Sequence, residues 1–214
     1  LRDIPPTTLG IIGLCTLLYV LQLILDLDLH KVTLCPRLVL YLHEYYRIIT
    51  SCFFHADLMH VGMNMVSTAA ISGILEKRFG TLRHLVTTLW SVLLTSCVYI
   101  LVAVFLSLGL GYDSLMYQHS VGFSGVIFHM SILECSLAPN RSRSVFGFFS
   151  VPSYLYPVAL LVALQMLMPN LSFTGHLAGI FMGLLQVFGF LDLISVSDEY
   201  LREMDSWTSL RWLT

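Results

Sequence analysis

Residues 121–126 read Val-Gly-Phe-Ser-Gly-Val, so that Ser124 stands between glycines at the front of an apolar segment. Further along, residues 173–179 read Phe-Thr-Gly-His-Leu-Ala-Gly and place His176 among glycines in a second apolar segment. Serine and histidine are the pair that many enzymes use to cut peptide bonds. We therefore treat these two stretches as the feature that the rest of the chain supports.

The composition is typical of a membrane protein. Of the 214 residues, 57% are hydrophobic and 11% are charged, and the mean hydropathy is +0.81. A soluble domain carries about 25% charged residues, so this chain has too little charge to cover a surface facing water. We expect a multi-pass protein whose surroundings are a lipid bilayer. The net charge of −2 and the lack of a basic patch indicate no nucleic-acid partner.

A helix that spans a bilayer needs roughly 20 mostly apolar residues, and six runs of this sequence meet that composition and approach that length. The sequence thus predicts an all-α membrane protein, a bundle of six transmembrane helices forming a single domain over residues 1–214. We expect the helices at about residues 7–25, 58–79, 82–108, 118–137, 152–168 and 172–194.

The basic residues orient this bundle by the positive-inside rule. One side receives Lys31, Arg37 and Arg47. The side that holds both ends of the chain receives Arg2, Lys77, Arg78, Arg83, Arg141, Arg143, Arg202 and Arg211. We expect the second side, with both termini, to be cytosolic. The helices expected at 58–79, 118–137 and 172–194 then all start on the opposite side and bring their polar residues to a similar depth.

The long loop between the first two helices, residues 26–57, is too apolar for a free loop and too interrupted for a spanning helix. We expect it to lie in the membrane interface, with its tyrosines at headgroup level. Arg47 could anchor it by donating to backbone carbonyls, and a disulfide between Cys35 and Cys52 is conceivable there. At the other end of the second helix, we interpret Glu76 as part of a solvated helix end with local ion pairs.

Ser124 alone has two interpretations, because small residues in a membrane helix often form a packing face. The presence of His176 favours the catalytic interpretation of Ser124, since ionisable groups at this depth are costly and usually functional. Glycines recur every four residues beside it, and such a bare stripe would let another helix come close. If it meets the helix of Ser124, His176 can take the hydroxyl proton as general base. The stripe consists of Gly175, Gly179 and Gly183.

No acidic residue is well placed as a third member, because Asp57, Asp113 and Asp192 fall in loops or at helix ends. The simpler hypothesis is a Ser124–His176 dyad oriented by packing. Phe128, one turn below Ser124, could stack on the imidazole.

His60 and Asn64 are spaced i, i+4 and share one helix face. Together with the backbone N–H of Ser124 they could form an oxyanion hole. An interhelical hydrogen-bond pair is the other interpretation. Metal binding is disfavoured, because His55 and His60 are five residues apart and no His-Glu-x-x-His pattern occurs.

These motifs resemble those of the rhomboid intramembrane serine proteases. The shared pattern comprises His60 and Asn64, then Gly122, Ser124 and Gly125, then Gly175, His176, Gly179 and Gly183. The run Glu-Lys-Arg-Phe-Gly at 76–80 is similar as well, and the stretch from Pro152 to Gly179 looks most like the eukaryotic rhomboids of the endoplasmic reticulum and Golgi.

The resemblance implies Ser124 as nucleophile, His176 as general base, and His60, Asn64 and the Ser124 amide as oxyanion donors. It implies single-pass membrane proteins as substrates and no cofactor. Two positions depart from the pattern: Tyr46 stands where the family has tryptophan before Arg47, and Phe128 stands where tyrosine is common.

Two other functions remain in view. A non-catalytic rhomboid-like protein would bind membrane clients for degradation or trafficking, but such relatives typically lack the serine or the histidine. A channel or transporter would need a pair of broken helices or a ladder of buried carboxylates, and the sequence shows neither.

Overall fold

The computed structural model describes residues 4–191 and 198–205. Arg2 and Arg211, which contributed to the orientation argument, and residues 192–194 of the sixth expected helix lie outside these ranges. Within them the chain is mostly helical, with a single two-stranded sheet.

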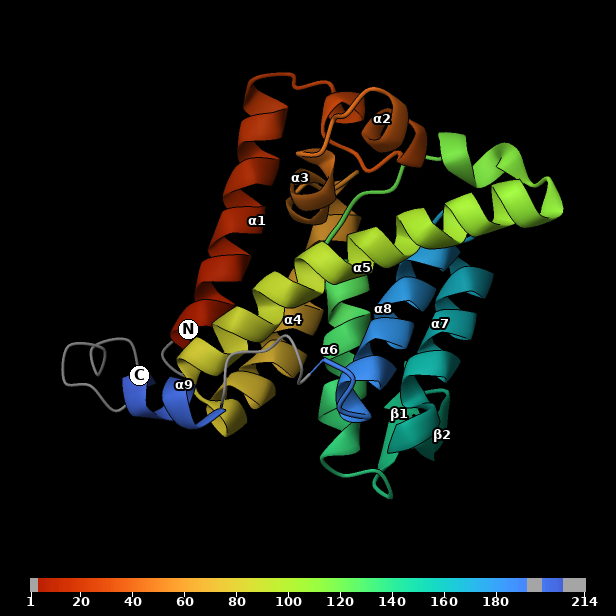
Figure 1. Ribbon diagram of the computed structural model, residues 1–214. Coiled ribbons are helices and arrows are strands. Elements are labelled where there is room, and N and C mark those ends of the chain that lie inside the picture. The colour runs from red at the N-terminus through yellow and green to blue at the C-terminus, as the bar shows by residue number, and fades with distance from the viewer. Residues whose placement is uncertain (1–3, 192–197, 206–214) are drawn as a thin grey trace.

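Three helices in the described part of the chain are long and apolar enough to cross a membrane by themselves: α1 (Pro6–Ile24), α4 (Leu58–Phe79) and α5 (Thr81–Leu110). Their bounds lie within two residues of those predicted from hydropathy. The other main helices are shorter: α6 (Ser124–Ser136), α7 (Tyr156–Leu167) and α8 (Phe173–Val187). Figure 1 shows α5 running obliquely across the other helices.

Local signals explain where the helices begin. The ring of Pro6 fixes a helical φ at the first position of α1, where no N–H partner is needed. The Asp57 carboxylate accepts from the backbone N–H of His60 at 2.7 Å and caps α4. The Ser172 hydroxyl accepts from the N–H of Gly175 at 3.1 Å and caps α8, which fixes where the histidine-bearing helix starts.

The segment between α1 and α4 is folded rather than extended. It contains η1 (Leu29–Lys31), α2 (Pro36–Tyr41) and α3 (Arg47–Phe53), and η2 (Asp113–Tyr117) lies against α2. Figure 1 shows these elements together at the end of the bundle where α1 finishes. All five cysteines are free thiols, so the conceivable Cys35–Cys52 disulfide is not formed.

A β-hairpin joins α6 to α7. Strand β1 (Ser142–Val145) pairs antiparallel with β2 (Phe149–Pro152), in a register that sets Ser142 opposite Pro152. This pairing, followed by η3 (Ser153–Leu155), corrects the predicted helix start at residue 152, because a residue engaged in a strand cannot also begin a helix. Arg143 of β1 forms an ion pair with Glu134 near the end of α6, which holds the hairpin against that helix.

The predicted helix over 118–137 begins too early: α6 starts at Ser124. The residues before Ser124 are extended because their backbone groups bond to the segment between α1 and α4. Ser120 exchanges two backbone hydrogen bonds with Leu34, at 2.8 and 2.9 Å, and the Gly122 N–H donates to the carbonyl of Ser51 at 2.8 Å. Gly122 has φ +113°, which favours glycine and is incompatible with a helix.

The predicted helix over 172–194 ends too late. Helix α8 stops at Val187, and Gly189, with φ +80°, turns the chain after it. The remaining described element, α9 (Asp198–Asp205), packs against α5.

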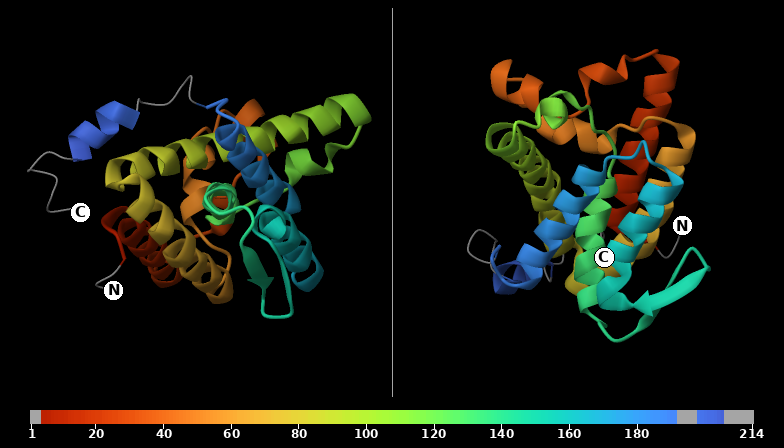
Figure 2. Two further views of the ribbon diagram at one scale, coloured as in Figure 1. Left: turned by 90° about the horizontal axis from the view of Figure 1, so that it is seen from below. Right: turned by 90° about the vertical axis from the view of Figure 1, so that its right-hand side faces the viewer.

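Helix α6 is the centre of the molecule. Every residue from Val126 to Cys135 is buried, and α6 contacts α4, α5, α7 and α8. The left-hand view in Figure 2 looks along α6 and shows these helices around it. The backbone hydrogen bonds to Leu34 and Ser51 explain why irregular backbone before this short helix is tolerated, since protein groups pair its polar atoms.

Glu76 does not form the solvated helix end that the sequence suggested. It is 2% exposed, and its carboxylate accepts three hydrogen bonds from the start of α1. The donors are the Thr7 N–H at 2.9 Å, and the Thr8 N–H and hydroxyl at 2.7 Å each. A negative charge at the N-terminus of α1 also complements the helix dipole. Glu76 therefore caps a helix that is distant in sequence.

We expect Glu76→Ala to lower the free energy of unfolding by roughly 2–4 kcal/mol, because three donors, two of them on the buried Thr8, lose a charged acceptor. Lys77→Ala, which changes the exposed neighbouring residue, is the control and should have little effect. Thermal unfolding in detergent measures both. Equal melting temperatures for the two variants would contradict the capping role.

Candidate active site

Ser124 and His176 are hydrogen-bonded. The distance between Ser124 Oγ and His176 Nε2 is 2.9 Å. Ser124 is the first residue of α6 and His176 the fourth of α8, and the imidazole is 3% exposed. The structure thus brings the serine and histidine of the two opening stretches into proton-transfer distance.

Glycine permits this approach. A Cβ atom on Gly179 would lie 2.0 Å from the carbonyl oxygen of Gly125, and one on Gly183 would lie 2.6 Å from the Ile132 Cβ. A Cβ on Gly125 would lie 3.2 Å from the Gly175 oxygen. Backbone therefore faces backbone between α6 and α8, and a larger residue at Gly179 or Gly183 would separate the helices.

The imidazole is held by packing as well as by Ser124. The rings of Phe128 and His176 lie 4.7 Å apart between centroids at an interplanar angle of 31°. Within residues 4–191 and 198–205, no hydrogen-bond partner is found for His176 Nδ1. Asp57 caps α4 and Asp113 bonds the Ser107 hydroxyl, while Asp192 lies outside the described residues.

His60 and Asn64 reach the same site. Together with Phe128, Ser124 and His176 they line a cavity of about 60 Å³ between α4, α6 and α7. Asn64 Nδ2 donates one hydrogen to the carbonyl of His60 at 2.8 Å. Because the amide group carries two hydrogens, one remains available to a ligand in the cavity.

A larger cavity lies beside the first. It has a volume of about 560 Å³ and is lined by side chains from four segments, residues 29–33, 56–60, 118–121 and 167–172. His60 lines both cavities. The larger one lies at the end of the bundle where α4, α6 and α8 begin.

His55, whose spacing from His60 was weighed only for metal binding, lies beside the site. It is fully buried, its Nε2 accepts from the Phe123 N–H at 3.5 Å, and its ring lies 5.1 Å from that of His60. His55 therefore contacts both the backbone before Ser124 and a cavity-lining side chain. The spacing of His55 from His60 could not predict its hydrogen bond with Phe123, because that bond depends on the path of residues 118–123 past His55.

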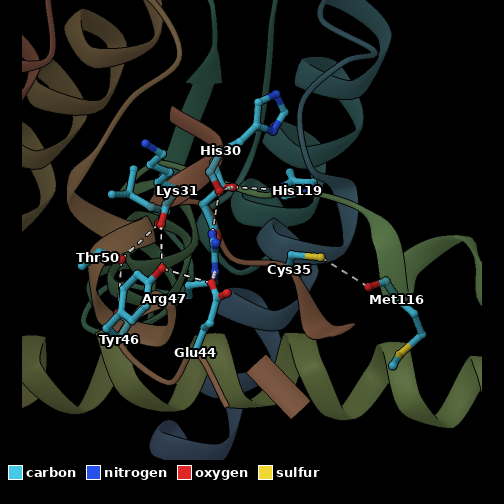
Figure 3. Close-up of polar contacts among 11 residues, drawn as sticks. His30, Lys31, Cys35, Glu44, Tyr46, Arg47, Thr50, Met116 and His119 are labelled. Carbon is cyan, nitrogen blue, oxygen red and sulfur yellow. Dashed lines mark hydrogen bonds and ion pairs between the residues drawn. The ribbon is translucent and has the colours of Figure 1, made fainter. Parts of the chain in front are cut away.

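Arg47 anchors the first loop, as its sequence position suggested (Figure 3). It is 4% exposed and donates to the carbonyls of His30 and Thr33, at 2.7 and 2.8 Å. Its Nε donates to Glu44 at 2.5 Å, and this hydrogen bond holds the pKa of Glu44 below its usual range. Tyr46, at the position that departs from the rhomboid pattern, also donates to Glu44, at 3.0 Å.

The loop anchored by Arg47 is joined to the segment before the serine. Thr33 Oγ1 lies 2.6 Å from His119 Nδ1, and Leu34 pairs with Ser120. The backbone that leads into Ser124 is therefore fixed from the side of the first loop.

The described residues contain no group of three or more His, Cys, Asp or Glu side chains able to hold a metal ion. The polar side chains that line the smaller cavity are those of Ser67, Ser124, Asn64, His60 and His176.

Comparison with known proteins places these features in a family. A family-wide sequence profile described as Rhomboid domain matches residues 42–193, which is more than half of the chain. The chain belongs to the rhomboid family.

Curated rhomboids resemble the chain over most of its length. Rhomboid-like protein 15 of Arabidopsis thaliana is 33% identical over 206 residues, covering 95% of this chain and 51% of the relative. Rhomboid-related protein 4 of Homo sapiens is 34% identical over 147 residues, covering 68% of this chain and 46% of the relative. Rhomboid-type serine protease 2 of Podospora anserina is 28% identical over 142 residues, covering 64% and 46%. The chain spans about half the length of these rhomboids.

If close backbone contact positions the rhomboid site, Gly179→Ala should destabilise the protein by roughly 1–3 kcal/mol, the usual cost of overpacking. Gly13→Ala in α1 is the matched control, because a Cβ there meets nothing within 4 Å. Thermal unfolding compares the two. A Gly179→Ala melting temperature equal to that of Gly13→Ala would show that the helices are not in tight contact.

Proposed function

We propose that this rhomboid is an intramembrane serine endopeptidase that cleaves single-pass transmembrane proteins with a Ser124–His176 dyad. The observation that carries the proposal is the 2.9 Å hydrogen bond between Ser124 Oγ and His176 Nε2, in the first turns of two apolar helices. Protease names among the relatives, such as rhomboid-type serine protease 2, support it at the level of the family.

The dyad would act in two stages. In the first, Ser124 Oγ attacks the scissile carbonyl while its proton passes to His176 Nε2. His176 then returns this proton to the leaving amine, which departs and leaves an ester on Ser124. In the second stage, water attacks the ester, gives a proton to His176, and releases the carboxylic acid as the proton returns to Ser124 Oγ.

The oxyanion formed in each stage needs donors. We propose His60, the free Asn64 amide hydrogen and the Ser124 backbone N–H for this role. The start of α6 at Ser124 supports the proposal, because the first N–H groups of a helix have no partner within it and the helix dipole there favours negative charge.

We propose six membrane crossings, with the shorter helices α6, α7 and α8 adding to α1, α4 and α5 within one domain over residues 1–214. Residues 26–57 would then form a loop in the interface, and both termini would be cytosolic. The cavity of about 560 Å³ would open to the lumen or exterior and supply water. We propose the endoplasmic reticulum or Golgi as the compartment, on the sequence pattern from Pro152 to Gly179.

The second candidate is a non-catalytic rhomboid that binds membrane clients. The hydrogen-bonded Ser124 and His176 favour the protease, because a binding protein has no need for a base at the hydroxyl.

Cleavage of a reporter transmembrane helix by the purified protein tests the activity. Ser124→Ala and His176→Ala should each lower the rate by about 10³-fold or more, because the nucleophile or its base is lost. A fluorophosphonate should label the wild type and not Ser124→Ala. Cleavage by both variants at the wild-type rate would remove the protease assignment.

Trypsin added to sealed microsomes tests the orientation. The exposed Arg141 beside the β-hairpin should be cut from the cytosolic face, while Lys31 and Arg37 should be cut only after detergent is added. Mass spectrometry of the fragments distinguishes the sites. Protection of Arg141 together with cleavage at Lys31 would reverse the topology.

A further inference from the structure

Helices α6 and α8 share a second polar contact, below the dyad. His129 Nε2 lies 2.7 Å from Gln186 Oε1, and because that oxygen only accepts, the imidazole donates. His129 is fully buried, and Gln186 is partly buried. Neither residue reaches the reacting atoms, so the proposed chemistry does not explain why a membrane protein keeps this pair.

The glycine stripe of α8 does not by itself fix the register of α8 on α6. Gly175, Gly179 and Gly183 recur every four residues, so the surface that meets α6 repeats itself after a shift of about one helical turn. Such a shift moves α8 along α6 by about 6 Å. Glycines permit close contact at either position, and packing of small residues therefore selects the register only weakly.

We propose that the hydrogen bond between His129 and Gln186 fixes the register of α8 on α6 and so positions His176 against Ser124. This inference rests on the proposed function. Both residues are positioning residues, since they act through the placement of the dyad.

The geometry supports this role in two ways. A one-turn shift would separate His129 Nε2 from Gln186 Oε1 by more than hydrogen-bond distance. The buried N–H of the imidazole would then lose its acceptor, which is costly inside a protein. The same shift would carry His176 away from Ser124, because both pairs join the same two helices. A buried polar pair that selects one register among several apolar alternatives has this effect in coiled coils.

The neighbourhood of the pair is tight. A Cβ on Gly183 would lie 2.9 Å from the carbonyl oxygen of His129 and 3.0 Å from Ile132 Cγ1. The pair thus lies where the two backbones are in close contact. A register fixed at this point is also the register of the rest of the α6–α8 interface.

The test uses four variants of the full chain in nanodiscs. His129→Leu and Gln186→Leu remove the hydrogen bond, His129→Gln retains an N–H donor near the same position, and Ser131→Ala is a control at another buried polar residue of α6. The rate of fluorophosphonate labelling at Ser124 reports the dyad without a substrate helix. Cleavage of a reporter helix gives kcat and KM, and thermal unfolding gives stability.

We expect both leucine variants to lower the labelling rate and kcat by roughly three- to twenty-fold, the range of interhelical hydrogen-bond energies, with KM within about twofold of wild type. His129→Gln should recover most of the rate, and Ser131→Ala should match the wild type. A loss confined to melting temperature, or no recovery in His129→Gln, would overturn the inference.

The two hypotheses can fail separately. Wild-type labelling rates in both leucine variants would overturn the register role and leave the protease assignment intact. A wild-type protein that takes no label and cleaves no reporter would overturn the proposed function and the inference with it.

Discussion

The contact between the backbone of Gly125 and that of Gly179 is the constraint on which the site depends. With a side chain at Gly179, the Cβ would lie 2.0 Å from the Gly125 carbonyl oxygen, and α6 and α8 could not adopt their present separation. Ser124 is short and His176 has a limited reach, so their 2.9 Å hydrogen bond requires this separation. The close packing of α6 and α8 and the hydrogen bond between Ser124 and His176 therefore depend on one contact, so a packing role for the glycines does not exclude a catalytic one.

The rest of the molecule keeps α6 in place for that contact. Leu34 and Ser51 bond the extended residues before Ser124, and Arg47 holds the loop that provides Leu34. Hydrogen bonds to protein make this irregular backbone tolerable, since they pair polar groups that regular secondary structure would otherwise pair. Helix α6 then begins at Ser124, and the first backbone N–H groups of a helix lack a partner within it.

Much of the site was predictable because it depends on periodicity. The depth and direction of the apolar runs place His60, Asn64, Ser124 and His176 at one level, and the structure has all four lining one cavity. The bounds of α4 were predictable for the same reason: Asp57 and Gly80 give start and stop signals at the ends of a strong apolar run.

Apart from the end of α8, where Gly189 turns the chain, the errors have a shared cause, which is contact between residues distant in sequence. The segment 118–137 was predicted as one helix, but pairing with Leu34 and Ser51 keeps its first residues out of the helix. Glu76 is charged and near a helix end, and only the packing of α1 reveals it as a cap. The β-hairpin before α7 and the roles of His55 and Gln186 depend likewise on neighbours that no local pattern specifies.

The most direct test is the structure of the protein after reaction with a peptidyl chloromethyl ketone. This reagent bonds to both members of a Ser–His dyad, since the serine adds to its carbonyl and the histidine displaces chloride. The account predicts one inhibitor linked to Ser124 Oγ and His176 Nε2, with its oxyanion facing His60, Asn64 and the start of α6. An inhibitor bonded elsewhere, or to neither residue in an active protein, would contradict it.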